Sequence, residues 1–223
     1  MINNFFLFNS CFDEISNLEL NLLSNEFYKN RAVNGGALYI RSGKIINMNE
    51  NKTITIENNT FSDNSADNFG GALYSEFHKM YLAKAINNTF SYNKAGILGG
   101  GVFSPNSISE NLFNIEDCTF LNNTVNSYIN NYTSKPSYIL MKPEFPDNLI
   151  QIITGTYLNL NFTLYDEFDN LIEDITKYYS SMTLKVVLEE QKDDNNSNNE
   201  NGLNHLNYQL IGNVGSFIRG KYI

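Results

Sequence analysis

An internal repeat dominates the first 130 residues and restricts the possible folds more than any other feature. Each unit has a phenylalanine, an asparagine three residues later, and then a Gly-Gly pair followed by small and apolar residues. The leading phenylalanines are 34, 29 and 30 residues apart. The repeated residues are Phe27, Asn30, Gly35, Gly36 and Leu38; Phe61, Asn64, Gly70, Gly71 and Leu73; Phe90, Asn93, Gly99, Gly100 and Val102; and, in a last unit without a glycine pair, Phe120 and Asn123.

These units are typical of short β-strands, because their apolar runs are brief, rich in Ile, Phe, Thr and Tyr, and bounded by Asn and Gly. The recurring Gly pairs and Asn clusters argue against helices. A period of about 30 residues favours one coil of a parallel β-solenoid, whose successive rungs lie about 4.8 Å apart. We therefore predict an interior stack of the four phenylalanines and an aliphatic stack of Leu38, Leu73 and Val102.

The asparagines and glycines of the repeat are assigned to corners of the coil. Asparagine tolerates a left-handed backbone and its amide can bond to the next rung, so we place Asn30, Asn64, Asn93 and Asn123 at one corner. The Gly pairs are placed at a second corner, which needs a positive φ or a close backbone approach.

The combination of F-x-x-N with G-G-A-[ILV] resembles the repeats of the chlamydial polymorphic outer-membrane proteins, and more broadly the right-handed parallel β-helix repeats of the pectin-lyase-like class. Similar Asn-rich repeats occur in large surface proteins of low-GC eukaryotes such as anaerobic gut fungi. The resemblance covers about residues 1–130. It implies an all-β fold that begins with a right-handed parallel β-helix of about three to four coils, and in the chlamydial family it implies adhesion.

The repeat stops after Tyr138, where Pro136, Pro143 and Pro146 mark a junction. Apolar and polar residues then alternate over residues 158–165 and 182–189, a pattern typical of half-buried antiparallel strands.

Residues 166–170 indicate a polar turn, residues 191–204 a solvated loop, and residues 208–211 and 217–222 two further strands. We therefore expect two domains: a parallel β-helix repeat domain at 1–135 and a partial immunoglobulin-like β-sandwich at 136–223, truncated at its C-terminus.

Charge excludes two classes of partner. With 15 Lys and Arg against 24 Asp and Glu, the net charge of −9 argues against nucleic-acid binding and against docking on an anionic membrane surface. The sequence has neither an apolar run long enough to span a membrane nor a recognisable secretory signal. We hypothesise that the chain is a fragment of a larger surface protein, and that any membrane span of this protein lies outside these residues.

Candidate catalytic and metal-binding residues form no pattern. Polysaccharide lyases and hydrolases with a β-helix fold need carboxylates on one face of adjacent rungs. The candidates are Asp63, Asp67, Glu76 and Asp117, with His78 and Lys79 near one connector. We assign them to solvated loops, so we expect no catalytic residues, no cofactor and no metal. The acidic pairs Glu189-Glu190 and Asp193-Asp194 lack the alternating spacing of a calcium loop.

The only two cysteines, Cys11 and Cys118, exclude a disulfide scaffold. We expect two buried free thiols, with a single bridge as the alternative.

Seven Asn-x-Ser/Thr sequons give weak support for secretion. We treat Asn51, Asn131, Asn161 and Asn195 as possible glycosylation sites. The other three, Asn58, Asn87 and Asn122, lie close to the core phenylalanines, where we expect that a glycan does not fit.

These observations favour a non-enzymatic extracellular or cell-surface protein, adhesin-like or structural, that presents its flat faces and the connectors 40–53 and 75–85 to an unknown protein or glycan. The alternatives are the ectodomain of a membrane receptor and a pectin-lyase-like, polysaccharide-active enzyme. Exposed tyrosines could stack on sugar rings, although we favour ordinary strand tyrosines; they are Tyr28, Tyr92, Tyr128 and Tyr132.

Overall fold

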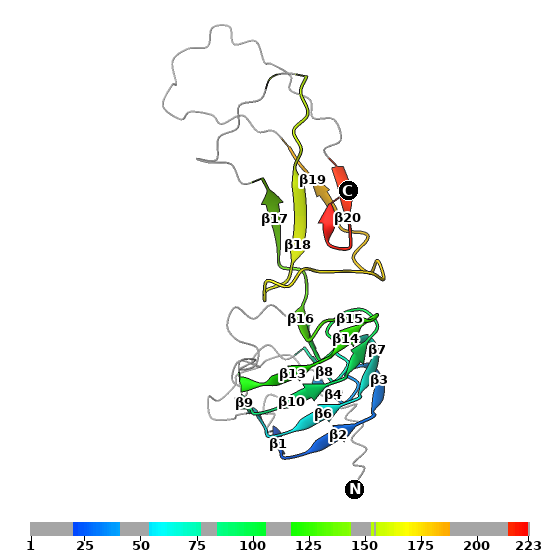
Figure 1. The fold of residues 1–223 in the computed structure, drawn as a ribbon, viewed down its shortest axis with the longest axis vertical. Coiled ribbons are helices and arrows are strands. Elements are labelled where there is room, and N and C mark those ends of the chain that lie inside the picture. Colours follow the sequence, from blue (N-terminus) through cyan, green and yellow to red (C-terminus); the bar gives the residue numbers. More distant parts are fainter. Residues whose placement is uncertain are drawn as a thin grey trace, which may run out of the picture.

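The computed structural model describes residues 20–40, 54–76, 84–105, 117–143, 153, 155–187 and 214–222, and in these ranges the regular structure is almost entirely β-strand (Figure 1). Four coils of chain follow one another, each with four short strands. In the first two coils the strands are β1 (Leu20–Leu23), β2 (Glu26–Tyr28), β3 (Arg31–Asn34) and β4 (Leu38–Ile40), then β5 (Ile54–Glu57), β6 (Thr60–Ser62), β7 (Ser65–Phe69) and β8 (Leu73–Ser75).

The third and fourth coils follow. Their strands are β9 (Lys84–Ile86), β10 (Thr89–Ser91), β11 (Lys94–Ala95) and β12 (Val102–Ser104), then β13 (Thr119–Leu121), β14 (Thr124–Val125), β15 (Tyr128–Ile129) and β16 (Tyr132–Ser134). The third repeats the order of the first two, but the described part of the fourth adds no strand to the β1-β5-β9 sheet and contains one extra strand, β15. Equivalent strands pair in parallel to form four stacked sheets, in the orders β1-β5-β9, β2-β6-β10-β13, β3-β7-β11-β14 and β4-β8-β12-β16. This arrangement is that of a parallel β-helix.

The last coil departs from the others because its sequence lacks the glycine pair. Strand β14 turns back at Asn126 and Ser127, both with positive φ, and continues as β15, which pairs antiparallel with β14. The chain then rejoins the helix as β16, in register with β12.

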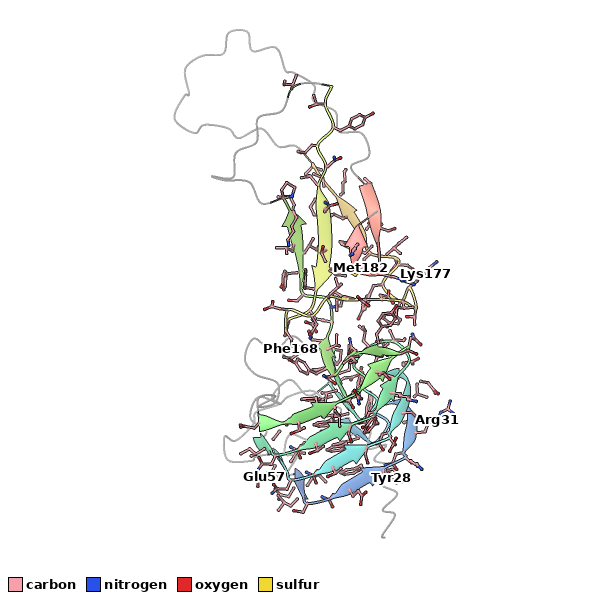
Figure 2. All side chains as sticks on the ribbon, viewed as in Figure 1. Tyr28, Arg31, Glu57, Phe168, Lys177 and Met182 are labelled. Carbon is pink, nitrogen blue, oxygen red and sulfur yellow. The ribbon has the colours of Figure 1, made fainter. Side chains whose placement is uncertain are left out.

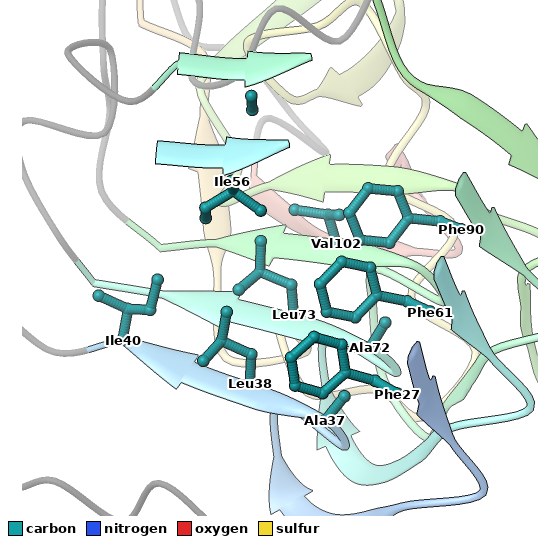
Figure 3. Packing of buried hydrophobic residues seen from close by; sticks show 11 residues of the cluster. Phe27, Ala37, Leu38, Ile40, Ile56, Phe61, Ala72, Leu73, Phe90 and Val102 are labelled. Atoms are coloured by element: carbon teal, nitrogen blue, oxygen red, sulfur yellow. The ribbon is translucent and has the colours of Figure 1, made fainter. Parts of the chain in front are cut away.

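The interior of the β-helix is a column of stacked side chains (Figure 3). The rings of Phe27 and Phe61 lie 4.6 Å apart between centroids, those of Phe61 and Phe90 4.7 Å, and those of Phe90 and Phe120 5.1 Å, all nearly parallel. Beside them, Leu38, Leu73 and Val102 occupy one register row and are buried. The spacing of the rings follows the spacing of the strands, because each phenylalanine pairs with its equivalent in the neighbouring coil.

At the first corner, the left-handed residue is not the one that the sequence predicted. The residues with left-handed backbone are those just before the repeat asparagines, namely Lys29, Asp63, Tyr92 and Asn122, with φ between 51° and 56°. Because this residue takes up the turn and points outward, the asparagine that follows faces the interior. Expecting a left-handed backbone at Asn30, Asn64, Asn93 and Asn123 was therefore wrong, whereas the expected amide bonding between rungs is present.

The two glycines of each pair have different roles. The first has positive φ, as at Gly70 with φ 64°. The second is needed for close approach, because a Cβ at Gly71 would lie 2.0 Å from the carbonyl oxygen of Gly100 in the next coil.

Beyond the β-helix, the C-terminal part forms a five-stranded antiparallel sheet in the order β17-β18-β21-β20-β19. Its strands are β17 (Tyr138–Lys142), β18 (Asn161–Tyr165), β19 (Thr183–Lys185), β20 (Val214–Ile218) and β21 (Lys221–Tyr222). The single strand expected over 217–222 is instead split by a turn at Arg219 and Gly220, both with positive φ. The described residues show one antiparallel sheet here, and an immunoglobulin-like sandwich is not seen among them.

This sheet and the β-helix share one hydrophobic cluster. Tyr74, Leu98 and Phe103 of the β-helix pack in the same buried cluster as four residues of the C-terminal part: Phe162, Leu164, Ile172 and Phe217. Figure 1 shows the sheet beyond the end of the coil stack that β13–β16 form. The last coil would otherwise expose unpaired strand edges and apolar side chains, so the C-terminal part acts as a cap on the β-helix.

Candidate functional site

Two ladders of buried side-chain amides run along the corners of the β-helix. In the first, Nδ2 of Asn64 donates to Oδ1 of Asn93 at 3.0 Å and to the carbonyl of Phe27 at 2.9 Å, and the same pattern recurs in neighbouring coils. The second ladder contains Asn25, Asn59, Asn88 and, at its end, Cys118. These amides satisfy corner backbone groups that burial would otherwise leave unpaired, so the ladders are structural.

The second ladder was not identified from the sequence. Its signal was the asparagine two residues before each repeat phenylalanine, visible at Asn25, Asn59 and Asn88. Cys118 stands at the equivalent position, half-buried and with a free thiol, and burial raises its pKa. The partner cysteine, Cys11, lies outside the described residues.

The structure does not bring the candidate carboxylates together. Asp63 is exposed at a corner, Asp67 pairs with Arg31 at 2.9 Å, and Glu76 accepts hydrogen bonds from the hydroxyls of Tyr39 and Tyr74. Asp117 is exposed near the start of the last coil. In the described ranges no three His, Cys, Asp or Glu residues gather as a metal site would require. The candidates His78 and Lys79, and the acidic pairs at 189–190 and 193–194, fall outside those ranges.

Most of the surface expected to meet a partner also lies outside the described residues, which exclude 41–53 and 77–83 of the two connectors. The outer faces of the β-helix are described. On them Tyr28 is exposed (Figure 2) beside the ammonium of Lys29, which lies 4.7 Å from the ring centroid. Tyr92 is also exposed and occupies the same corner position as Lys29, two coils further on.

A cleft of about 440 Å³ lies at the junction between the last coil and the C-terminal part. One wall is the segment from Tyr128 to Tyr132, and the other is formed by residues 170–175. The hairpin β14–β15 positions the first wall, and the polar turn at 166–170 positions the second. The hairpin that replaces the glycine corner in the last coil therefore contributes to one wall of the cleft.

The lining of this cleft combines an aromatic ring, amides, a carboxylate and aliphatic side chains. Tyr128 and Ile129 are exposed, whereas Asn130 and Asn131 are half-buried. The Oδ1 atoms of both asparagines accept hydrogen bonds within the fold, Asn130 from Gly99 N and Thr133 and Asn131 from Asn123. Within the described residues their Nδ2 groups donate no hydrogen bond, and Glu173 supplies an acceptor on the facing wall.

The four candidate tyrosines are therefore not equivalent. Tyr128 lines the cleft and is exposed, whereas the ring of Tyr132 packs between Phe120 and Phe168, at centroid distances of 5.3 and 5.2 Å. Tyr132 is thus a core residue at the end of the aromatic column, and Tyr28 and Tyr92 lie on the outer faces.

The sequons are also distinguished by their surroundings. Asn58, Asn87 and Asn122 are exposed, which contradicts the expectation that the nearby phenylalanines leave no room there. Asn161 is exposed at the start of β18, and Asn131 is half-buried in the cleft wall. Asn51 and Asn195 fall outside the described residues.

Among the described residues, no helix is both long enough and apolar enough to cross a lipid bilayer.

Comparison with known proteins gives one match. Residues 60–76, which span β6 to β8 with the second Gly-Gly pair, match the repeat described as the Chlamydia polymorphic membrane protein repeat. Neither the curated proteins nor the solved structures contain a significant match to the chain. The chain thus carries a repeat of the type found in Chlamydia polymorphic membrane proteins, and the matched residues form three of the four strands of one coil of its parallel β-helix.

Proposed function

We propose that this chain is a non-enzymatic, extracellular or cell-surface binding region of the adhesin type, part of a larger protein. The match of residues 60–76 to the polymorphic membrane protein repeat carries the proposal, because the name of that family places its members at membranes. The architecture supports it: a capped β-helix is a rigid rod that holds its loops and faces at a fixed distance from an attachment point.

The partner is a protein or a glycan, bound at the junction cleft between the last coil and the C-terminal part. An aromatic ring at Tyr128, free amide donors at Asn130 and Asn131, and the carboxylate of Glu173 give apolar, donor and acceptor groups in one concave site. The acidic net charge of −9 makes an anionic partner unfavourable.

A labelling experiment tests the location. Cells that express the native full-length gene are treated with a membrane-impermeant biotin reagent, and the protein is then captured and detected. We expect labelling comparable to that of a known surface protein and at least ten times that of an internal control. Labelling equal to the internal control would reject the proposal.

A binding experiment tests the cleft. The chain is screened against immobilised glycans and extracellular-matrix proteins, and each hit is repeated with Tyr128→Ala and with Tyr92→Ala. The two tyrosines are matched controls, because their side chains are 49% and 48% exposed and only Tyr128 lines the cleft. We expect Tyr128→Ala to weaken binding about tenfold, the effect of losing about 1.4 kcal/mol, and Tyr92→Ala to leave it unchanged. Equal effects would place the binding surface elsewhere.

The enzymatic alternative is tested with the same protein. We expect no release of reducing ends or unsaturated products from pectin and related glycans, and sustained turnover would overturn the non-enzymatic assignment.

A further inference from the structure

Three sequon asparagines occupy the left-handed corners of the β-helix. Asn58 and Asn87 follow β5 and β9 with φ of 55° and 56°, and Asn122 follows β13 with φ of 51°. All three are exposed. The left-handed backbone at each of these residues directs its own side chain outward and the side chain of the following asparagine inward. The three sequon asparagines therefore face solvent although the next residue in the chain is buried.

The backbone at these corners is fixed, whereas the side chains are not. The N–H of Asn58 donates to the carbonyl of Ile86 at 3.0 Å, and the N–H of Asn87 donates to the carbonyl of Asp117 at 2.9 Å. In the described part of the chain, the carboxamides of Asn58, Asn87 and Asn122 have no hydrogen-bond partner. A group attached to Nδ2 would therefore break no hydrogen bond between described residues.

Asn131 shows the opposite situation. Its Oδ1 accepts from Nδ2 of the fully buried Asn123 at 3.1 Å, and its backbone carbonyl accepts from the N–H groups of Gly101 and Val102. The side chain is half-buried in the cleft wall. A branched glycan on Asn131 would have to pass through this wall to reach solvent. A glycan on one of the exposed corner asparagines would meet no such wall.

We propose that the corners of the β-helix carry N-linked glycans, at Asn122 and at Asn58 or Asn87. This inference rests on the proposed extracellular location, because the modification needs passage through a secretory pathway. Nδ2 of the asparagine attacks C1 of an oligosaccharide carried on a polyprenyl pyrophosphate. The N–C bond forms, the C–O bond to the pyrophosphate breaks, and the Nδ2 proton is released.

The pair Asn58 and Asn87 lies on one corner, on successive rungs about 4.8 Å apart. Two glycans this close would crowd each other, so occupation of either residue satisfies the proposal. Glycans there would cover the β5–β6 and β9–β10 corner and leave the junction cleft open for a partner.

The experiment measures site occupancy on the unaltered chain. The chain of 223 residues is secreted from eukaryotic cells behind a cleavable signal. Its glycans are released by amidase in heavy-oxygen water, and peptide mass spectrometry reads the fraction of each asparagine that was modified. We expect Asn122, and Asn58 and Asn87 taken together, to be occupied at least ten times more than Asn131.

Two substitutions verify the assignment. Thr124→Val removes the Asn122 sequon and keeps a β-branched side chain in β14, and Thr124→Ser restores the sequon. We expect the Asn122 signal to vanish in the first variant and to return in the second. Unmodified corner asparagines, or Asn131 occupied as highly as they are, would overturn the inference. Because the added signal supplies secretion, such a result counts against these sites and not against the surface location, which the labelling experiment tests.

Discussion

The backbone N–H of Ser134 donates a hydrogen bond to Oδ2 of Asp166, at an N···O distance of 3.0 Å. Ser134 ends the last strand of the β-helix, and Asp166 follows β18 of the C-terminal sheet, so one buried carboxylate joins the two parts. The same carboxylate accepts from the N–H groups of Phe168 and Asn170 and from Nδ2 of Asn170. The turn at 166–170 is thus more than a polar connector: it holds the cap on the β-helix.

We predict that Asp166→Ala destabilises the protein by roughly 3 kcal/mol, because several buried N–H donors would lose their acceptor at about 1–3 kcal/mol each, partly offset by water. Urea unfolding followed by circular dichroism measures the loss. Asp169→Ala, three residues further on, is the control: Asp169 is exposed and accepts from the hydroxyl of Tyr138. A loss at position 166 no larger than that at position 169 would contradict the assigned role.

The ionisation of Asp166 should give a characteristic pH dependence. Burial raises the pKa of its carboxyl above the ordinary value of 3.8, and hydrogen bonds from Ser134, Asn170 and Phe168 counteract this only in part. The folded protein therefore holds the proton more tightly than the unfolded chain does, and the free energy of unfolding falls as the pH rises from about 3.8 through the raised pKa.

This dependence is measured as a difference between two proteins. Asp166→Asn does not titrate at this position, so the stability of the wild type relative to the variant should decrease over that pH window and then level off. Urea unfolding of both proteins between about pH 3 and pH 7 gives the difference. A wild type that gains stability over the variant as the pH rises would reverse the predicted sign.

The aromatic column predicts a graded response to truncation. We expect Phe61→Ala to cost about 3–5 kcal/mol, because the ring is fully buried between Phe27 and Phe90 and its removal leaves a cavity. Phe168 lies outside the coils, where the C-terminal part meets the β-helix (Figure 2). It contacts the column through an edge-to-face pair with Tyr132. Phe168→Ala should cost less, about 1–2 kcal/mol, because the ring is only partly buried. Thermal unfolding ranks the two variants, and equal losses would contradict the stacking arrangement.

Phe168 also illustrates what the sequence alone leaves open. Rows such as Phe27, Phe61 and Phe90 could be predicted because the same residue recurs at the same place in each unit, so one periodic signal specifies the in-register packing. Phe168 belongs to no repeat, and its contact with Tyr132 joins positions 36 residues apart, one in a turn of the C-terminal part and the other in a strand of the β-helix. Alternation predicts that a strand such as β18 buries Phe162 and Leu164, but it does not indicate which surface covers them.

The corner asparagines show a second reason why local inference is incomplete. The recurring asparagine of F-x-x-N predicted a left-handed residue at this corner, but the left-handed position is the one before it. Lysine, aspartate and tyrosine occupy that position as well as asparagine, so only the backbone identifies Lys29, Asp63 and Tyr92 as the turning residues. Moving the turn by one residue reverses which side chain is buried. The exposure of Asn58, Asn87 and Asn122 was missed for this reason. The junction cleft could not be predicted because the β14–β15 hairpin that forms one wall occurs in only one coil and so gives no periodic signal.

The second glycine of each pair should tolerate no side chain. A Cβ at Gly71 would lie 2.0 Å from the carbonyl oxygen of Gly100 and 2.6 Å from that of Lys94, and both are backbone atoms held in strands or corners. We expect Gly71→Ala to abolish folding of the β-helix, observed as loss of the β-sheet circular-dichroism signal and of soluble protein.

Gly155→Ala is the matched control, since its Cβ would meet nothing within 4 Å and only its positive φ opposes the change. We expect about 1 kcal/mol there; a stable Gly71→Ala protein would contradict the packing of the glycine corner.

The first amide ladder, which contains Asn64, Asn93 and Asn123, should lose stability when one asparagine is replaced by its isostere aspartate. Nδ2 of Asn93 donates to the carbonyl of Phe61 at 2.9 Å and to Oδ1 of Asn123 at 2.8 Å, and the side chain is fully buried. An aspartate here would place carboxylate oxygen against both acceptors, so Asn93→Asp should lose about 3 kcal/mol or more near neutral pH.

Asn122→Asp is the control, because it makes the same change at the exposed corner residue one rung further on, whose φ of 51° aspartate also tolerates. Because a protonated carboxyl can donate again, the loss at position 93 should shrink as the pH is lowered towards about 4, while the control stays flat. Urea unfolding at both pH values measures this, and a loss at position 93 that is small or independent of pH would show that the amides do not bond from rung to rung.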